Sequence, residues 1–274
     1  MRGAALLCLL AAGCAAQPSA KGGGIVSLNP CADAMLVELV PPARIAAISH
    51  YSRDPGASSI APDVAARYRT NNGTAEEIIA LRPDLAIIDS FASVSTREAL
   101  ARAGVKTLTL GWASTIEDSK KQVRELAAAL NARPAGDAMV ARIDGAIAAA
   151  RTDRPPLSAL LWIGGNTVNG SGTLLDEMMV KAGFSDHAAH YGLQGTGYLP
   201  IEHVVADPPR VMLVPDEAGR DAGSRAAQMR GWALARSGAK VDQARFNRSL
   251  VNCGGPVIAR AMTRLAEVRR EVGE

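Results

Sequence analysis

The chain has 274 residues, which is enough for two lobes of about 100 to 150 residues each. Hydrophobic residues make up 48% and charged residues 21% of it, a composition that is ordinary for a folded protein and argues against disorder. The net charge is only +3 and the basic residues are scattered, so nucleic acid is not an expected partner.

Residues 1–24 indicate an export signal followed by a tether, because Arg2 precedes a short apolar run and small residues follow it. Two processing sites compete. Residues 10–14 resemble a lipobox, which would place a lipid on Cys14, whereas residues 14–16 suit ordinary signal peptidase. We expect a lipid-anchored periplasmic protein in the first case and an unanchored one in the second. No later stretch reaches the roughly 20 apolar residues that a membrane span needs.

The next part of the chain, residues 25–130, alternates strand and helix signals and is predicted to form an N-terminal lobe. Short apolar stretches predict strands at residues 25–28, 45–48 and 85–88, and another strand is predicted at residues 105–110. Helical spacing, with Pro or Gly at the ends, predicts three helices. One follows residue 30, and the others cover residues 75–81 and 96–103. Strands that alternate with helices indicate a parallel sheet covered on both faces.

Two helical segments with little strand between them follow, at residues 116–130 and 135–150. We expect residues 131–156 to form a long rigid interdomain helix, with Pro134 in its first turn. The pattern then restarts in residues 157–274, the predicted C-terminal lobe, with strands at 159–163 and 211–214, a Gly/Asn-rich loop at 164–172, and helices at 173–182, 225–237 and 256–272. The predicted fold class is α/β, with two Rossmann-like lobes that each contain a central sheet.

One segment occurs twice, at residues 74–84 and 200–210. Each copy has a Glu in the first turn of a helix, Glu76 or Glu202, where it favours the positive end of the helix dipole. Each copy also has a Pro that ends the helix before a buried strand. Any helix with these two signals would look similar, but the matching order and spacing in two lobes favour an internal repeat.

Together with residues 27–30, 49–55 and 103–105, the two Glu segments resemble the periplasmic substrate-binding proteins of ABC importers for cobalamin, iron siderophores and haem. The resemblance extends from residue 25 to the C-terminus. The run Tyr51-Ser52-x-Asp54-Pro55 most resembles the vitamin B12-binding member. The resemblance implies two lobes joined by a rigid helix, and it implies that Glu76 and Glu202 dock on arginines of a permease, one glutamate from each lobe.

The expected function is therefore capture of a cobalamin-like corrinoid and its delivery to an ABC permease with its ATPase subunits, with a ferric siderophore or haem as the alternative ligand. Cobalt or iron would belong to this metal-chelate ligand, and we expect no cofactor or metal of the protein's own. A monomer is expected. A non-transport sensor or scaffold with the same fold is the competing class, and an enzyme is disfavoured, because residues 164–170 lack the order of a phosphate-binding loop and no G-x-S-x-G occurs.

The ligand is expected in the cleft, where loops leave the carboxyl ends of the strands. These loops supply Asn29, Cys31, His50, Tyr51, Phe91 and Trp112 from the first lobe and Asn166, Tyr198, Phe246 and Cys253 from the second. Aromatic residues make up only 4% of the chain. Those near strand ends therefore suggest walls for a large, flat, partly apolar ligand, although core packing explains any one of them as well, Trp162 most readily.

Histidines and cysteines leave alternatives open. His50 could ligate a metal centre in the ligand, as could a second cluster of His187, His190 and Tyr191, but a lone loop His is more often a surface hydrogen-bonding residue. The His spacings match no zinc signature. Cys31 and Cys253 are the two cysteines beyond the export segment, and they could form a disulfide, face the ligand as a pair, or stay as separate thiols.

Overall fold

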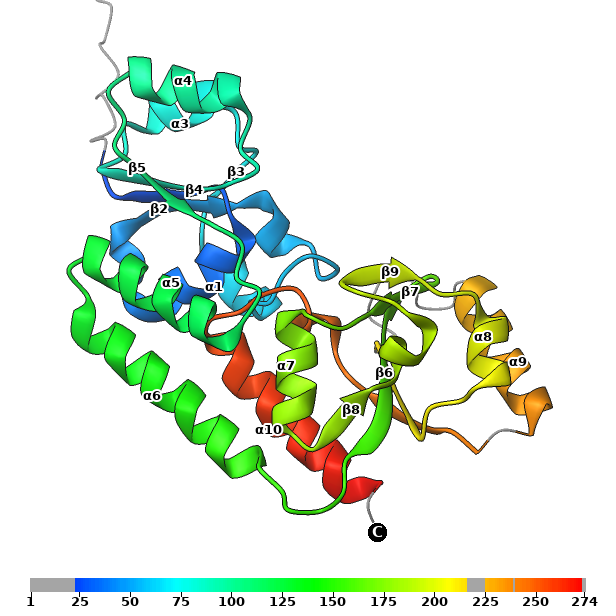
Figure 1. Cartoon of the computed structure of the whole chain (residues 1–274). Coiled ribbons are helices and arrows are strands. Elements are labelled where there is room, and N and C mark those ends of the chain that lie inside the picture. Colours follow the sequence, from blue (N-terminus) through cyan, green and yellow to red (C-terminus); the bar gives the residue numbers. More distant parts are fainter. Residues whose placement is uncertain (1–22, 216–224, 239, 273–274) are drawn as a thin grey trace, which may run out of the picture.

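In the computed structural model, which describes residues 23–215, 225–238 and 240–272, the chain forms two lobes, each around its own sheet (Figure 1). The expected export segment with Cys14 lies almost entirely outside these residues. The described part contains no helix that is both long enough and apolar enough to cross a bilayer.

The first lobe is a parallel sheet with helices on both faces, as predicted. Its strand order is β3-β2-β1-β4-β5 and every pairing is parallel. Alternate strand residues serve opposite faces: Val26 and Ala86 pack under α3 and α4, whereas Ile25 and Ile87 pack with α1. The elements of this lobe are β1 (Ile25–Ser27), α1 (Pro30–Leu39), η1 (Pro42–Arg44), β2 (Ile45–Ser49), η2 (His50–Arg53), α2 (Pro62–Ala65), β3 (Thr70–Asn71), α3 (Ala75–Leu81), β4 (Leu85–Asp89), α4 (Val94–Arg102) and β5 (Thr107–Leu110).

Two antiparallel helices follow, α5 (Ile116–Ala129) and α6 (Arg133–Ala150) (Figure 1). They approach closely at Gly136, where a Cβ atom would lie 2.5 Å from the Cβ of Ala127. The turn between them places Asn131 in the left-handed region, with φ of 54°. Helix α6 covers most of residues 131–156, where the sequence predicts the connecting helix, but it ends at Ala150 and residues 151–156 are not helical. It packs against α5 and against the last helix of the chain.

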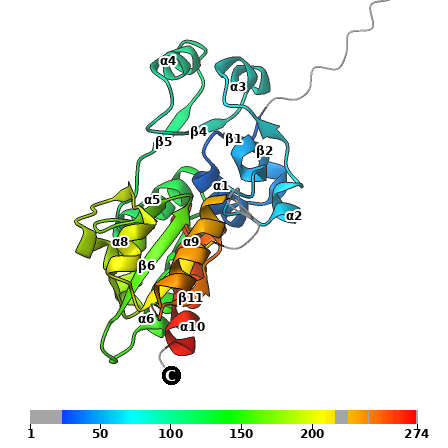
Figure 2. The ribbon, with the colours of Figure 1, turned by 90° about the vertical axis from the view of Figure 1, so that its right-hand side faces the viewer.

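The second lobe repeats the α/β pattern only in part. Its elements are β6 (Leu157–Gly164), β7 (Thr167–Asn169), α7 (Leu174–Lys181), β8 (Phe184–Asp186), η3 (His187–Tyr191), β9 (Thr196–Tyr198), α8 (Ile201–Ala206), β10 (Val211–Val214), α9 (Arg225–Ser237), β11 (Asp242–Arg245), η4 (Arg248–Leu250) and α10 (Pro256–Glu271). The sheet order is β11-β10-β6-β7-β9, and β8 pairs with the first half of β6. Helices α8 and α9 cover one face of β6, as Figure 2 shows, and α10 and α7 lie against the other.

The loop predicted for residues 164–172 is wrong for residues 167–169, which form strand β7. The chain reverses at Gly165, whose φ of 56° suits glycine, and returns as β7, antiparallel to β6. Strand β9 pairs antiparallel with β7 in turn. The second sheet is thus mixed, whereas the first is parallel throughout.

One hydrophobic core runs from the first lobe into the second, through α1, α5, α6, α7 and α10. Polar links cross the same boundary: the backbone N–H of Ile116 donates to Glu177 at 2.7 Å, and the guanidinium of Arg260 donates to the carbonyl of Ser59 at 2.6 Å. Because apolar packing and hydrogen bonds join the lobes beneath the cleft, the structure favours small lobe movements over wide opening.

Candidate functional site

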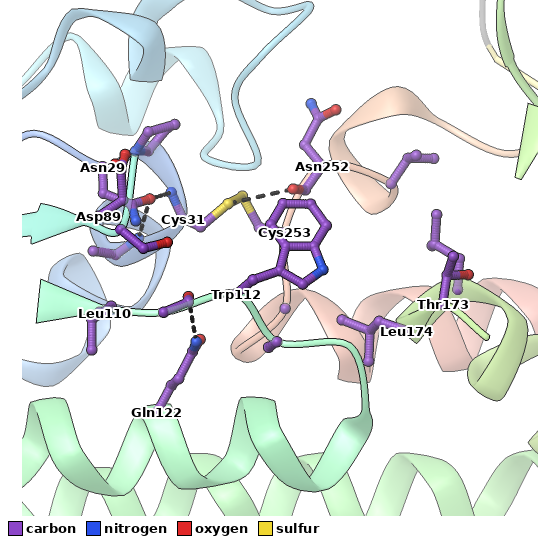
Figure 3. Close-up of a pocket in the computed structure, with 18 of the residues that line it drawn as sticks. Asn29, Cys31, Asp89, Leu110, Trp112, Gln122, Thr173, Leu174, Asn252 and Cys253 are labelled. Atoms are coloured by element: carbon purple, nitrogen blue, oxygen red, sulfur yellow. Dashed lines mark hydrogen bonds between the residues drawn. A yellow bond between two sulfur atoms is a disulfide. The ribbon is translucent and has the colours of Figure 1, made fainter. Parts of the chain in front are cut away.

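A cavity of about 420 Å³ lies between the lobes at the carboxyl ends of their strands (Figure 3). The first lobe contributes the start of α1 and the segments that follow β4 and β5. The second lobe contributes the end of β6, the start of α7 and the loop before α10. The predicted site residues Asn29, Cys31, Phe91, Trp112 and Cys253 all line it.

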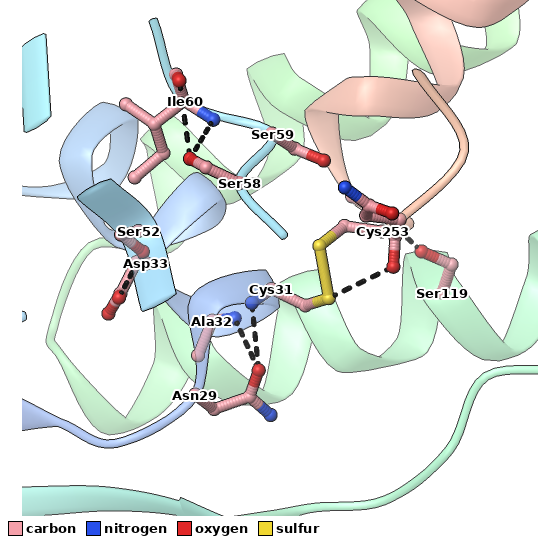
Figure 4. Close-up of a disulfide and its surroundings, with 12 residues drawn as sticks. Asn29, Cys31, Ala32, Asp33, Ser52, Ser58, Ser59, Ile60, Ser119 and Cys253 are labelled. Carbon is pink, nitrogen blue, oxygen red and sulfur yellow. Dashed lines mark hydrogen bonds between the residues drawn. A yellow bond between two sulfur atoms is a disulfide. The ribbon is translucent and has the colours of Figure 1, made fainter. Parts of the chain in front are cut away.

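Asn29 is the N-cap of α1 and orients its first turn. Its side-chain Oδ1 accepts from the backbone N–H groups of Cys31 at 2.8 Å and Ala32 at 3.2 Å. This cap fixes Cys31 on the side that faces the second lobe, where it forms a disulfide with Cys253, with the Cα atoms 5.1 Å apart (Figure 4). Of the three states that the sequence leaves open, the structure contains the disulfide. It joins the first turn of α1 to the residues just before α10, and so crosslinks the lobes at the cavity wall.

The cavity exposes two large aromatic side chains of the first lobe. Phe91 is 76% and Trp112 is 75% exposed, and their rings meet edge to face with centroids 6.3 Å apart. The loops that carry them are held in place: Asp89 accepts from the N–H of Phe91 at 2.8 Å, and Gln122 donates to the carbonyl of Gly111 at 2.7 Å. The pair therefore presents apolar surface to the cleft from positioned loops.

A second cavity of about 340 Å³ adjoins the first and shares Asp89 and Phe91 with it. His50 and Tyr51 line it side by side, with ring centroids 4.0 Å apart. The Nδ1 of His50 lies 3.2 Å from the carbonyl of Asn71, which can only accept, so Nδ1 carries the proton. In the neutral ring Nε2 then keeps a lone pair, which is the form of imidazole that binds a metal.

Asp33, which is not among the residues predicted from the sequence, supports this part of the site from below. Its buried Oδ2 accepts from the N–H of Ser49 at 2.9 Å and from the hydroxyl of Ser52 at 2.6 Å, so it holds both sides of the turn η2 that carries His50 and Tyr51. Burial raises the pKa of the Asp33 carboxyl to about 7, against the smaller opposing effect of these hydrogen bonds. The sequence did contain a signal for this role, because Asp33 is an acidic residue on an otherwise apolar face of α1.

Three predicted contacts line neither cavity. Phe246 is 2% exposed and lies in the core, because it continues the inward-facing alternation of Ala244 at the end of β11. Asn166 and Tyr198 bond to each other at 3.0 Å across the ribbon formed by β7 and β9. Trp162 is buried as well, and its indole N–H donates to the carbonyl of Gly165 at 2.7 Å, as core packing predicts.

Glu76 and Glu202 occupy equivalent places in the two lobes. Each is the second residue of its helix, α3 or α8, and each side chain is exposed. Neither forms an ion pair with another residue of the described ranges. Glu77 behaves differently, since its carboxylate accepts from the backbone and side chain of Asn72 at 2.7 and 2.9 Å. Both lobes thus present one unengaged carboxylate at a helix start.

Structures of known proteins share this architecture. A haem-binding protein, RhuT from Roseiflexus sp. RS-1, matches over 92% of this chain and 100% of its own, with a TM-score of 0.72 and 23% identity. The haem-binding HutB of Vibrio cholerae matches over 90% and 98%, with a TM-score of 0.71 and 16% identity. The vitamin B12-binding BtuF of Vibrio cholerae matches over 91% and 97%, with a TM-score of 0.65 and 18% identity.

At these identities the likeness establishes the fold. A comparison with curated protein sequences gives no match. The sequence itself matches the family described as periplasmic binding protein over residues 25–231, about three quarters of the chain. The chain therefore belongs to the periplasmic binding protein family.

Proposed function

We propose that this protein is the substrate-binding component of an ABC importer and that it captures a metal-centred tetrapyrrole between its lobes. The family is one of solute-binding proteins rather than enzymes, and it implies a periplasmic location. The observation that carries the choice of ligand class is the exposed pair Phe91 and Trp112 on the cavity wall. Large apolar side chains on pre-positioned loops suit a broad, flat ligand, because aromatic rings stack on a macrocycle at little cost in conformational entropy.

Among tetrapyrroles, haem fits the geometry best. His50 and Tyr51 lie next to each other in the adjoining cavity, and imidazole nitrogen and phenol oxygen are both axial ligands of haem iron. The bond from Nδ1 of His50 to the carbonyl of Asn71 leaves Nε2 free to coordinate. The solved structures of similar fold include haem-binding proteins, which supports the same choice.

A corrinoid is the second candidate, since the run Tyr51-Ser52-x-Asp54-Pro55 resembles the vitamin B12-binding member and BtuF shares the fold. Titration of the purified protein with ferric haem, cobalamin and ferrichrome, followed by absorbance and tryptophan quenching, separates the candidates. We expect haem to bind at one site. His50→Ala with Tyr51→Phe should shift the Soret band and weaken binding, whereas Tyr198→Phe, outside both cavities, should change neither.

Binding of cobalamin alone would overturn the haem assignment and keep the tetrapyrrole class. Binding of ferrichrome alone would overturn the class and leave the transport role. Failure of all three to bind would remove the ligand proposal altogether.

We propose that the protein docks on the permease through Glu76 and Glu202 when it delivers the ligand. Two exposed carboxylates on two lobes suit a partner with two similar basic sites, such as the paired subunits of a permease. Glu76→Ala with Glu202→Ala should abolish stimulation of the permease's ATPase while ligand affinity stays unchanged. Glu98→Ala, which changes an exposed glutamate of α4, is the matched control. Equal stimulation by the double variant and the control would refute this role.

We also propose that Cys14 carries a lipid, which would hold the protein at the membrane surface. Mass spectrometry of the protein purified from cells tests this point, because a diacylglyceryl group on an N-terminal Cys14 differs in mass from an unmodified terminus at residue 15 or beyond. Recovery of only the unmodified form would refute the lipid anchor and would leave the proposal of ligand capture unaffected.

A further inference from the structure

We propose that the second lobe holds a site for a divalent transition metal, with Zn²⁺ as the best match, formed by His187, His190 and Asp207. This site is independent of the cleft and of the proposed ligand. One ligand atom from each of the three side chains lies within 4.8 Å of those from the other two.

The local structure brings the two imidazoles together. His187 and His190 lie three residues apart in η3, and residues at this spacing eclipse one another in a 3₁₀ helix, which has three residues per turn. Their ring centroids are 4.2 Å apart. Asp186 begins the turn by accepting from the N–H of Ala188 at 3.0 Å. The parallel pairing of β8 with β6 then fixes where η3 starts.

Asp207 reaches the same point from another element, as the C-cap of α8. Its Oδ2 lies 3.4 Å from Nε2 of His187 and 3.3 Å from Nδ1 of His190. In a tetrahedral zinc site with bonds of about 2.0 to 2.2 Å, neighbouring ligand atoms are about 3.3 to 3.6 Å apart. Two of the three ligand–ligand distances are therefore already those of a bound ion, and the exposed His190 ring can adjust the third.

Metal binding requires that His187 release one hydrogen bond. Its Nε2 now lies 2.9 Å from the backbone carbonyl of Asp207, and that carbonyl also accepts from the hydroxyl of Tyr191. The carbonyl therefore stays satisfied when Nε2 turns to a metal. The ring proton moves to Nδ1, which is buried and meets no hydrogen-bond partner among the described residues, so the change of tautomer breaks no bond there.

The charges around the site favour a cation. Within the described residues, the only ion-pair partners of the Asp207 carboxylate are the two histidines, and no Lys or Arg occupies it. Two imidazoles and one carboxylate with an open fourth position form a donor set that zinc commonly takes.

The site lies at the opposite end of the second sheet from the cleft. Ala159 of β6 pairs with both Asp186 and Val211, which places η3 and the residues before β10 at the amino end of these strands. The cavity contains Ile163, four residues further along β6, or about 13 Å. A bound ion would clamp η3 to the last turn of α8 without touching the cleft.

The test is calorimetric titration of the EDTA-treated full-length protein with Zn²⁺, repeated with Co²⁺ by absorbance. His190→Ala and Asp207→Ala alter exposed side chains and should remain folded, which circular dichroism checks. His203→Ala is the matched control, because it removes the other histidine near this end of α8. We expect one Zn²⁺ per chain in the wild type and in His203→Ala. Loss of a second-shell partner costs 10- to 100-fold in affinity, so loss of a direct ligand should cost more than about 100-fold.

Cobalt should give the visible absorption of a tetrahedral complex without a thiolate charge-transfer band, which separates this site from Cys8 and Cys14. The proposal is overturned if the wild type binds no Zn²⁺, if His190→Ala binds it equally well, or if a thiolate band appears. The cluster would then serve only as the hydrogen-bonded end of α8.

Discussion

Removing the disulfide should destabilise the protein strongly, because the crosslink closes a very long loop. Cys31 and Cys253 are 222 residues apart in sequence. The chain-entropy relation for a loop of this length gives a stabilisation of about 5 kcal/mol at 25 °C, and measured disulfides give about 2 to 4 kcal/mol. We therefore expect Cys31→Ala with Cys253→Ala to lower the free energy of unfolding by about 2 to 5 kcal/mol.

Equilibrium unfolding in guanidinium chloride, followed by tryptophan fluorescence, measures this loss. Wild-type protein kept in reductant should match the double variant, and the double variant should not respond to reductant. A thiol count on the unreduced, unfolded mature protein should find no reactive thiol at Cys31 or Cys253. Equal unfolding free energies with and without reductant, or reactive thiols at these two positions, would refute the crosslink.

Two further predictions concern the buried Asp33 and the cavity-lining Gly254. The pKa of Asp33 is about 7 in the folded protein and 3.8 in a model peptide, so its contribution to stability is fully present below about pH 4 and is lost as the pH rises through 7. Relative to Asp33→Asn, the wild type should lose up to about 4 kcal/mol of unfolding free energy between pH 4 and pH 7, and parallel pH profiles of the two proteins would contradict this. Gly254→Ala would place a Cβ atom 2.3 Å from Oγ of Ser119, which accepts from Gly255, and should cost about 1 to 3 kcal/mol by chemical denaturation. Gly145→Ala, on an open face of α6, should instead stabilise by up to about 1 kcal/mol, and a similar loss at both positions would contradict the packing argument.

The first lobe could be predicted well because its signals are local and strong. Three of its five strands, β1, β2 and β4, are mainly apolar runs, and β5 alternates Thr and Leu. Gly104 and Pro83 mark the ends of the helices before β5 and β4. The two-residue β3 gives no such signal. In the second lobe, β7, β8 and β9 are three residues each, too short for a periodic pattern, and the reversal at Gly165 reads as a loop. Their pairing depends on contacts between distant residues, which periodicity does not encode.

The candidate site divides in the same way. Residues that directly follow first-lobe strands, such as Phe91 and Trp112, line the cavity, because the carboxyl ends of parallel strands meet at one edge of a sheet. The rule fails for Asn166 and Tyr198, which meet at one end of the antiparallel ribbon, whereas Asn169 and Thr196 at its other end line the cavity. Asp33 and Asp207 were not predicted as site residues for a different reason. Each side chain has its hydrogen-bond or ion-pair partners on another element of the fold.

The aromatic wall of the cleft is the central claim, and one measurement tests it most directly: the dissociation constant for haem of Trp112→Ala compared with that of Trp232→Ala. Both tryptophans are exposed, 75% and 60%, but only Trp112 lines the cavity. Loss of a stacking aromatic removes about 1 to 3 kcal/mol. We expect Trp112→Ala to weaken binding about tenfold or more and Trp232→Ala to leave it unchanged. Equal affinities in the two variants would contradict capture of a flat ligand at this wall.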